Sequence, residues 1–201
     1  MPSLQQAVDF LYDKTYIQDK WTSTARLDTL AEYCIEEMQG RGISPWEDEV
    51  RLDSWARDKQ WDVVHPPEGR PKIAISMKSI LKNLAGTVPN RTDDLIGEVT
   101  DLQMRYPEVV IGYIVLVDAA DTDDEPNRYE WANELEARLQ SISGRSPPYW
   151  GTGSVEAACV IKTDLAGEGG PEILTDKAET EEFFDTLTEQ YSNRYGGQET
   201  F

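Results

Sequence analysis

The nine-residue run VVIGYIVLV at positions 109–117 is the sequence feature that most constrains the fold. It has the length of a single β-strand and contains no charged residue. A strand with one exposed face alternates between apolar and polar residues, whereas a strand that is apolar throughout is covered on both faces. The run therefore predicts a central strand in a sheet that carries helices on both sides.

The segments around this strand show helical and strand periodicity in turn. The predicted helices are 3–13, 24–39, 92–105, 126–142 and 176–191, and the predicted strands are 61–64, 72–78, 109–117 and 155–163. Ser23 or Thr24 is expected to cap the second helix, and Thr92 the third. Residues 41–60 have no clean period, and we expect a loop there with one short strand or one turn of helix.

This order of elements predicts a single α/β (α+β) domain, residues 1–201, with a central mixed β-sheet flanked by helices. A chain of 201 residues is long enough to bury one proper core. We place amino-terminal helices in 1–40, the core sheet in 61–165 and a closing helix in 176–193. Loops are expected at 81–90 and 143–154.

The chain is strongly acidic, with 38 Asp and Glu against 19 Lys and Arg and a net charge of −19. The acids are spread along the chain, which favours a solvated surface suited to high ionic strength over mimicry of DNA. Cys34 and Cys159 stand far apart in apolar patterns, which is typical of buried thiols in a reducing compartment. We find no signal peptide and no apolar stretch long enough to span a membrane, so we expect a cytoplasmic protein.

One window departs from this acidity. Between Glu68 and Asp93 there is no acidic residue, and the window carries five positive charges, which are Arg70, Lys72, Lys78, Lys82 and Arg91. A local excess of cations in an acidic chain indicates a binding site for an anion.

The same window contains a predicted β-hairpin. The strands 61–64 and 72–78 are joined by PPEGRP, a typical turn sequence. If the hairpin centres on Gly69, residue 62 lies opposite residue 76, and Asp62, Ser76 and Lys78 converge on one patch. A register slip of one residue would instead point Asp62 away from Lys78.

These three residues suit the hydrolysis of a phosphodiester. Such a reaction needs a divalent metal held by oxygen ligands and a cation that stabilises the developing charge. Asp62 and a backbone carbonyl near Met77 would hold the metal, and Lys78 would orient the attacking water or neutralise charge. Ser76 stands where a second acid is expected. The single histidine, His65, is interpreted as a turn residue beside Pro66, and zinc chemistry is not expected.

These residues also carry a resemblance to a known family. Asp62 followed by SMK at 76–78, after an amino-terminal helix and before a helix and a buried strand, resembles the PD-(D/E)XK restriction-endonuclease-like superfamily. KS at 78–79, NRTDDLIGE at 90–98 and DL at 101–102 are similar to a segment of some type II restriction endonucleases. The similarity covers residues 61–118. It implies a restriction-endonuclease-like core and a type II-like deoxyribonuclease that uses Mg²⁺ to hydrolyse double-stranded DNA.

The sequence departs from the family pattern in two places. No proline precedes Asp62, and Ser76 replaces the usual Glu or Asp, which removes a metal ligand. Three outcomes stay open: a site with one metal ion, a site completed by Glu68 or Glu98 as further metal ligands, or a site without activity.

DNA contacts are expected outside the catalytic residues. Lys82, Asn90 and Arg91 would contact phosphates, although Arg91 is as readily read as an exposed loop cation. Arg145, in a loop with Tyr149 and Trp150, would enter a DNA groove, or the loop is simply packed on the surface.

The expected partner is double-stranded DNA, bound by a homodimer, because two-fold symmetry is the simplest way to cut both strands of a symmetric site. A cognate methyltransferase is a further partner that the sequence leaves open. Two alternatives compete with a nuclease: a catalytically inactive subunit of the same fold that binds DNA or serves assembly, and an acidic protein that binds a basic partner.

Overall fold

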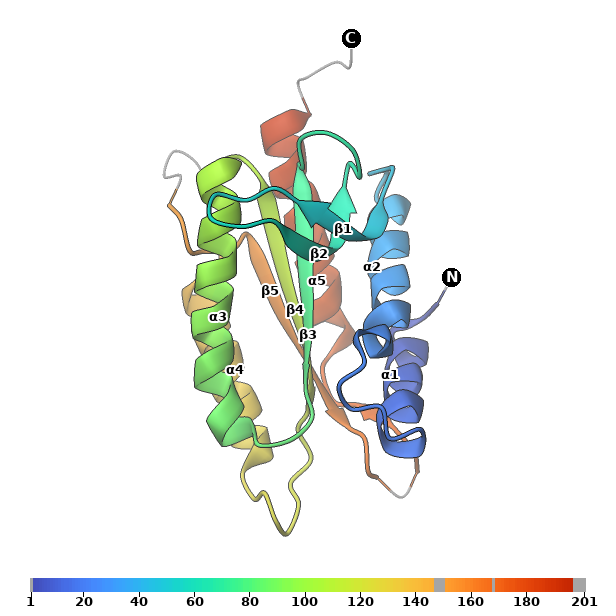
Figure 1. Ribbon diagram of the computed structural model, residues 1–201. Helices are drawn as coiled ribbons and strands as arrows, with labels where there is room; N and C mark the ends of the chain where they lie inside the picture. Colours follow the sequence, from blue (N-terminus) through green and yellow to red (C-terminus); the bar gives the residue numbers. More distant parts are fainter. Residues whose placement is uncertain (1, 147–150, 168, 197–201) are drawn as a thin grey trace.

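The computed structural model describes residues 2–146, 151–167 and 169–196 and contains a six-stranded mixed sheet in the order β1-β2-β3-β4-β5-β6 (Figure 1). The strands are β1 (Glu47–Leu52), β2 (Lys59–His65), β3 (Ile73–Ile80), β4 (Val110–Asp118), β5 (Ala157–Asp164) and β6 (Glu172–Ile173). The helices are α1 (Leu4–Tyr12), α2 (Asp28–Gly40), α3 (Leu84–Arg105), α4 (Arg128–Ser141) and α5 (Lys177–Tyr195).

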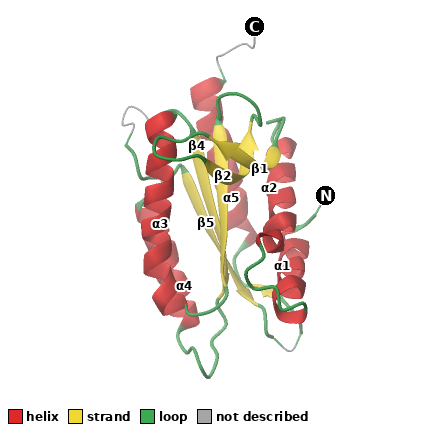
Figure 2. Ribbon diagram, viewed as in Figure 1, coloured by secondary structure: helices red, strands yellow, loops and turns green. Residues whose placement is uncertain are grey.

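The sheet lies between two layers of helices, which confirms the predicted fold class (Figure 2). Strands β3, β4 and β5 are parallel, and the crossover helices α3 and α4 cover one face. Helices α1, α2 and α5 cover the other face. All nine residues of β4 are buried, as the apolar run predicts. Gly112 lets α5 approach this strand, because a Cβ there would lie 2.9 Å from Phe183 and Leu187.

The hairpin of β2 and β3 has the predicted register. Val63 pairs with Ile75, Val64 with Ala74 and His65 with Ile73, and this register brings residue 62 opposite residue 76. The two strands then separate, while β3 continues beside β4 up to Ile80. Within the described residues, positions 76–80 of β3 therefore have strand partners on the β4 side alone. This free edge of β3 positions the candidate site.

Helix α3 begins earlier than the sequence predicts. Residues 84–90 were expected in a loop, because Gly86 and Pro89 disfavour helix. The structure shows one helix from Leu84 to Arg105 that runs through Pro89. Leu84 and Val88 are fully buried and extend the apolar stripe of the helix by two turns, so packing outweighs propensity. Thr92 lies inside the helix and its Oγ1 donates to the carbonyl of Val88, so it is not a cap.

The start of α2 also differs from the prediction. Ser23 precedes a 3-10 turn (Thr24–Leu27) and makes no side-chain capping hydrogen bond. The α-helix itself begins at Asp28, whose negative charge lies in the first turn, where it interacts favourably with the helix dipole.

Both cysteines are free thiols that are buried in the core, as predicted. Burial raises the pKa of the Cys159 thiol to about 12, and it raises the pKa of Cys34 even further, so both remain protonated at neutral pH. Among the described residues, no helix has the length and apolar character that crossing a membrane requires.

His65 is a buried strand residue whose titration should affect stability. Its side chain is 4% exposed, Nδ1 donates to the carbonyl of Pro45 at 2.7 Å, and Nε2 lies 3.3 Å from the hydroxyl of Tyr191. Burial lowers the pKa of His65, the Pro45 hydrogen bond partly opposes this, and the charge of Lys72 adds to it.

The imidazole of His65 therefore binds its proton more tightly in the unfolded chain than in the folded protein. The contribution of neutral His65 to the free energy of unfolding is present in full above about pH 6.5 and is lost as the pH falls below that value. We expect a slope of up to about 1.4 kcal/mol per pH unit. Urea unfolding between pH 8 and 5.5, on the wild type and His65→Gln, measures this contribution as the difference between the two pH profiles. Parallel profiles would show that His65 does not contribute to the pH dependence.

Candidate active site

The three residues predicted to converge do meet, at the point where β2 and β3 separate. Nζ of Lys78 lies 3.6 Å from Oδ2 of Asp62 and donates to Oγ of Ser76 at 3.0 Å. Oδ2 of Asp62 also accepts a hydrogen bond from the backbone N–H of Met77 at 2.7 Å. The Asp62 side chain therefore occupies the position that the next strand pairing would take, and the predicted geometry of these residues is confirmed.

Local strand geometry explains this arrangement. Ser76 and Lys78 are two residues apart, so their side chains share one face of β3, opposite Tyr113 and Val115 of β4. Ser76 is 3% exposed, whereas the side chains of Asp62 and Lys78 are 34% and 24% exposed. The carboxylate and the ammonium are therefore accessible to a ligand, and the buried Ser76 hydroxyl accepts a hydrogen bond from the ammonium.

Helix α3 brings further charges to this face of the sheet. Burial is the main cause of the raised pKa of the Tyr113 phenol, and the charges of Glu98, Asp94 and Asp62 raise it further, while Arg91 lowers it. Charges from α3 and from β2 therefore act on the same hydroxyl. The carboxylate of Glu98 forms an ion pair with Lys59, so the predicted metal ligand is near this face but is held by a strand lysine.

Three carboxylates near Asp62 were not predicted from the sequence. Asp62 lines a cavity of about 220 Å³ together with Asp28, Asp48 and Glu49. The pairing of β1 with β2 places Glu49 opposite Asp62. Because residues 41–60 gave no clean period, the position of β1, and hence of Asp48 and Glu49, had no signal in the sequence. Among the described residues, no three His, Cys, Asp or Glu side chains are arranged to hold a metal ion.

Glu68 does not belong to the site. It lies in the exposed loop that closes the hairpin, whereas Asp62 and Lys78 lie at the end where β2 and β3 separate. Asp62 lies three residues, or about 10 Å, before the end of β2 at His65, and Glu68 lies beyond that end. The prediction of Glu68 as a metal ligand is therefore wrong, because a hairpin loop and the open end of the same hairpin point in opposite directions.

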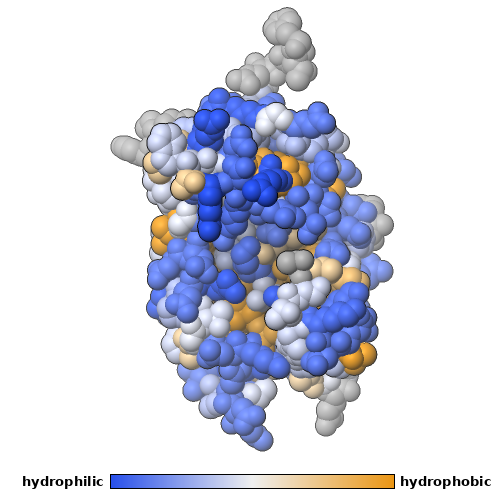
Figure 3. All heavy atoms as spheres, in the orientation of Figure 1, coloured by the Kyte–Doolittle hydropathy of each residue, from blue (hydrophilic) through white to orange (hydrophobic). Residues whose placement is uncertain are grey.

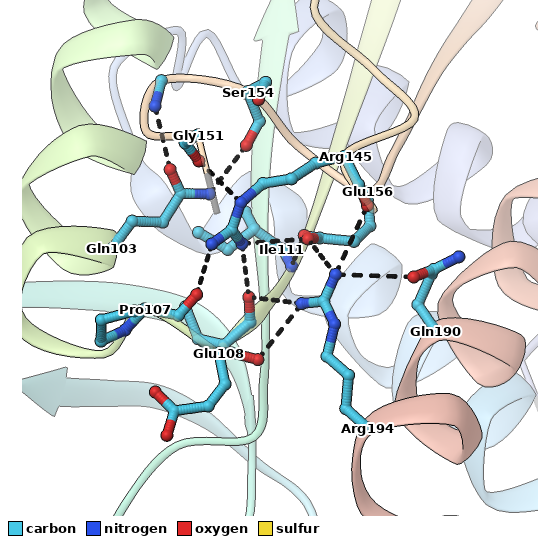
Figure 4. A network of polar contacts seen from close by, with 12 residues as sticks. Gln103, Pro107, Glu108, Ile111, Arg145, Gly151, Ser154, Glu156, Gln190 and Arg194 are labelled. Carbon is cyan, nitrogen blue, oxygen red and sulfur yellow. Dashed lines mark hydrogen bonds and ion pairs between the residues drawn. The ribbon is translucent and has the colours of Figure 1, made fainter. Parts of the chain in front are cut away.

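Arg145 is buried in a structural network and is not a groove-binding residue (Figure 4). Its side chain is 2% exposed and its Nη1 lies 3.0 Å from Oε1 of Glu156, which is fully buried. Nη2 of Arg194 reaches the same oxygen at 2.7 Å, and Oε2 of Glu156 accepts from the backbone N–H of Ile111 at 2.6 Å. The predicted DNA contact is wrong because this guanidinium compensates a buried carboxylate.

Gln103 of α3 fixes the end of the same loop (Figure 4). Its Nε2 donates to the carbonyl of Ser154 at 2.7 Å, and its Oε1 accepts from the N–H of Gly153 at 2.9 Å. The loop that contains Arg145 is therefore a packed surface loop at these positions, which was the alternative interpretation. The other residues predicted to enter a groove with it, Tyr149 and Trp150, lie outside the described residues.

The basic window divides between two ends of β3. Arg70 forms an ion pair with Glu108 at 2.6 Å, and Lys72 lies over the ring of Tyr195 at 5.3 Å, both near the hairpin loop. Lys82 and Arg91 line one cavity near the carboxyl end of β3, on the side of Lys78. Asn90 is exposed on α3, where its Nδ2 donates to the carbonyl of Gly86 at 3.0 Å.

The site thus combines a carboxylate, an ammonium group and a hydroxyl at the free edge of β3. Comparison with known proteins adds no assignment, since no family model and no curated protein matches the chain. An oxyanion placed beside Lys78 would meet a positive charge, and a cation placed beside Asp62 would meet a negative one. This arrangement can bind a phosphate together with a divalent metal ion.

Proposed function

We propose that the protein is a Mg²⁺-dependent endonuclease that hydrolyses phosphodiester bonds of double-stranded DNA in the manner of type II restriction enzymes. The observation that carries this proposal is the 3.6 Å separation of Lys78 Nζ and Asp62 Oδ2 at the open end of the hairpin. The order of elements supports it, because helices precede this hairpin and a helix and a buried strand follow it. This order is the one that the resemblance of residues 61–118 to the PD-(D/E)XK superfamily implies.

The residues present fit a magnesium ion. Mg²⁺ binds through one or two carboxylates together with waters and substrate phosphates, so it does not require a cage of acids. Asp62 would hold it, with the backbone carbonyl near Met77 as a second oxygen. Glu98 of α3 pairs with Lys59 and lines a different cavity from Asp62, so it would not complete the shell. When bound, the ion polarises the phosphate and lowers the pKa of a water molecule. The carboxylates of Asp28, Asp48 and Glu49 raise the local concentration of cations.

Lys78 has the role of stabilising charge. Its ammonium group lies next to the metal-binding carboxylate, and the hydrogen bond to Ser76 fixes its position. A fixed cation stabilises the negative charge that develops on the phosphate without reorganisation of water. Ser76 is thus a positioning residue that holds the lysine, in place of the acid that the family pattern has there.

The remaining parts of the proposal follow from this chemistry. We propose a homodimer, because two copies of one site cut both strands. The net charge of −19 repels DNA at low salt, so cleavage should require enough KCl to screen it. A reducing cytoplasm suits the two buried thiols, and a cognate methyltransferase would protect the host's own sites.

Asp62→Asn tests the proposal directly. The asparagine oxygen can still accept the Met77 hydrogen bond, so the fold should persist while the charge that binds the metal is lost. We expect the wild type to cleave plasmid or phage DNA with Mg²⁺ at some KCl concentration, and Asp62→Asn to cleave at least about 10²-fold more slowly. The exposed Asp123→Asn serves as the matched control and should cleave like the wild type. Equal cleavage by Asp62→Asn would remove the site assignment.

One observation favours a second function. The residue in the position of the usual acid is Ser76, which is buried and neutral, so the chain has one carboxylate fewer than the family pattern. A catalytically inactive subunit that binds DNA would not need this second carboxylate. The absence of cleavage by the wild type at every KCl concentration, together with retained DNA binding, would establish this second function in place of the first.

A further inference from the structure

A second cavity, of about 320 Å³, lies near the carboxyl end of β3 and carries only positive charges. Its lining consists of three cationic residues, two residues with hydroxyl groups and three apolar or aromatic residues: Arg26, Lys82, Arg91, Ser79, Thr87, Trp21, Ile80 and Leu81. Each of four other cavities in the described part of the protein is lined by at least two carboxylates. A cavity with no carboxylate in its lining is unusual in a chain with 38 Asp and Glu, and it suits an anionic ligand.

The three cations come from three separate segments. Arg26 belongs to the turn before α2, Lys82 follows β3, and Arg91 lies on α3. In Figure 1, β3 extends beyond β2 between the amino-terminal segment and α3. Figure 3 shows a hollow on this same face, with apolar atoms at its floor and hydrophilic atoms around it. The fold therefore gathers these charges at the free edge of β3.

The cationic side chains are held in place but retain unused donors. Nε of Arg26 donates to Oγ of Ser79 at 2.9 Å, which leaves the Ser79 O–H free to donate in turn. Nζ of Lys82 lies 3.4 Å from the centre of the Trp21 ring. Arg91 contacts Asp94 through Nη1 at 3.3 Å, while its buried Nε has no hydrogen-bond partner among the described residues.

The positive charges also repel one another. Burial lowers the pKa of the Arg26 guanidinium, and the nearby charge of Arg91 lowers it further. An anion between the two guanidinium groups would relieve this repulsion and would accept from several donors at once. Charge-assisted hydrogen bonds of this kind, to a phosphate oxygen, are among the stronger polar contacts in proteins.

We propose that Arg26, Lys82 and Arg91, with the hydroxyl of Ser79, bind a backbone phosphate of the DNA strand next to the phosphate at Lys78. This proposal rests on the proposed function for the identity of its ligand. Met77, whose N–H is bonded to Asp62, and Ser79, which lines the cavity, are about 6.6 Å apart along β3. The two positions therefore lie close together along the free edge of β3, so a single DNA strand that follows this edge would contact both.

The test measures binding without cleavage. Fluorescence anisotropy of a short labelled duplex, in EDTA and over a range of KCl, gives Kd for the wild type, Arg26→Gln and Lys82→Gln. We expect each variant to bind about tenfold more weakly and to lower the slope of log Kd against log[KCl] by about 0.9. Arg138→Gln removes one charge from the exposed surface of α4 and should bind like the wild type. Lys82 is exposed, so its variant should fold normally even if Arg26→Gln does not.

Each outcome decides the proposal. Wild-type affinity in both variants, or no duplex binding by the wild type at any KCl concentration, overturns it, whether or not the wild type cleaves DNA. Calorimetric binding of inorganic phosphate that Arg26→Gln abolishes, with unchanged duplex binding, also overturns it, because the cavity would then take free phosphate. If the wild type binds the duplex but does not cleave DNA, and both variants bind more weakly, this inference is supported and the nuclease is rejected.

Discussion

Replacing Lys78 with alanine is expected to reduce the rate of DNA cleavage by about 10²–10³-fold. Among the described residues, the ammonium group is the one positive charge that contacts Asp62, at 3.6 Å, and the hydrogen bond to Ser76 holds it there. In the proposed reaction it stabilises charge that exists only in the transition state, so its loss should lower kcat and kcat/KM together. Single-turnover cleavage of a plasmid with Mg²⁺, at the best KCl concentration of the wild type, measures the effect.

Two further variants separate catalysis from stability and from net charge. Lys177→Ala removes a lysine whose side chain is 85% exposed on α5, and it should cleave like the wild type. Lys78→Arg keeps the charge but not the compact ammonium geometry, so it should restore little of the rate. If Lys78→Ala cleaves as fast as Lys177→Ala, the lysine has no part in the reaction and the candidate active site is wrong.

Replacing Glu156 with glutamine is expected to destabilise the protein by about 3–5 kcal/mol. The carboxylate is fully buried and lies against two buried guanidinium groups, those of Arg145 and Arg194. Glutamine keeps the size of the side chain but removes the charge, so two buried cations lose their compensation. The carboxylate accepts hydrogen bonds through both oxygens, including one from the N–H of Ile111, whereas the glutamine amide has a single acceptor oxygen. Removing one member of a buried ion pair is costly for these reasons.

Urea unfolding at neutral pH measures this loss as a shift of the transition midpoint. The matched control is Glu134→Gln on α4, whose carboxylate pairs with Arg138 on the exposed surface. Exposed pairs of this kind contribute about 0–1 kcal/mol, so the control should unfold close to the wild type. A loss below about 1 kcal/mol in Glu156→Gln would mean that the ion pairs of Glu156 with Arg145 and with Arg194 of α5 contribute little to stability. DNA cleavage by any folded Glu156→Gln should persist, since the network lies apart from Lys78.

The network also shows why one site residue was misassigned. An arginine in a loop rich in Gly, Pro and aromatic residues has the composition of a nucleic-acid contact, and Arg145 was predicted as one. Its partner Glu156 is 11 residues away and Arg194 is 49 residues away, so no local pattern could reveal the buried triad. Burial of a charge is decided by which distant segments pack over it.

The opposite error concerns Arg26. It was not predicted as a site residue, because a single arginine before a helix has no distinguishing pattern. The fold places it against Ser79, 53 residues away, and in the same cavity lining as Arg91 of α3. Similarly, Asp48 and Glu49 join the cavity of Asp62 only because β1 pairs with β2, and residues 41–60 have no period that predicts this strand.

The sequence by itself determined the features that depend on local periodicity. The apolar run at 109–117 became the buried β4, and the turn centred on Gly69 set the register that brings Asp62 to Ser76 and Lys78. Strand alternation and turn geometry act over a few residues, so they can be read along the chain. The tertiary structure alone decided that α3 runs through Pro89, that Arg145 is buried and that Arg26 and Arg91 line one cavity. These outcomes depend on packing between segments far apart in the chain, where burial energy outweighs local propensity.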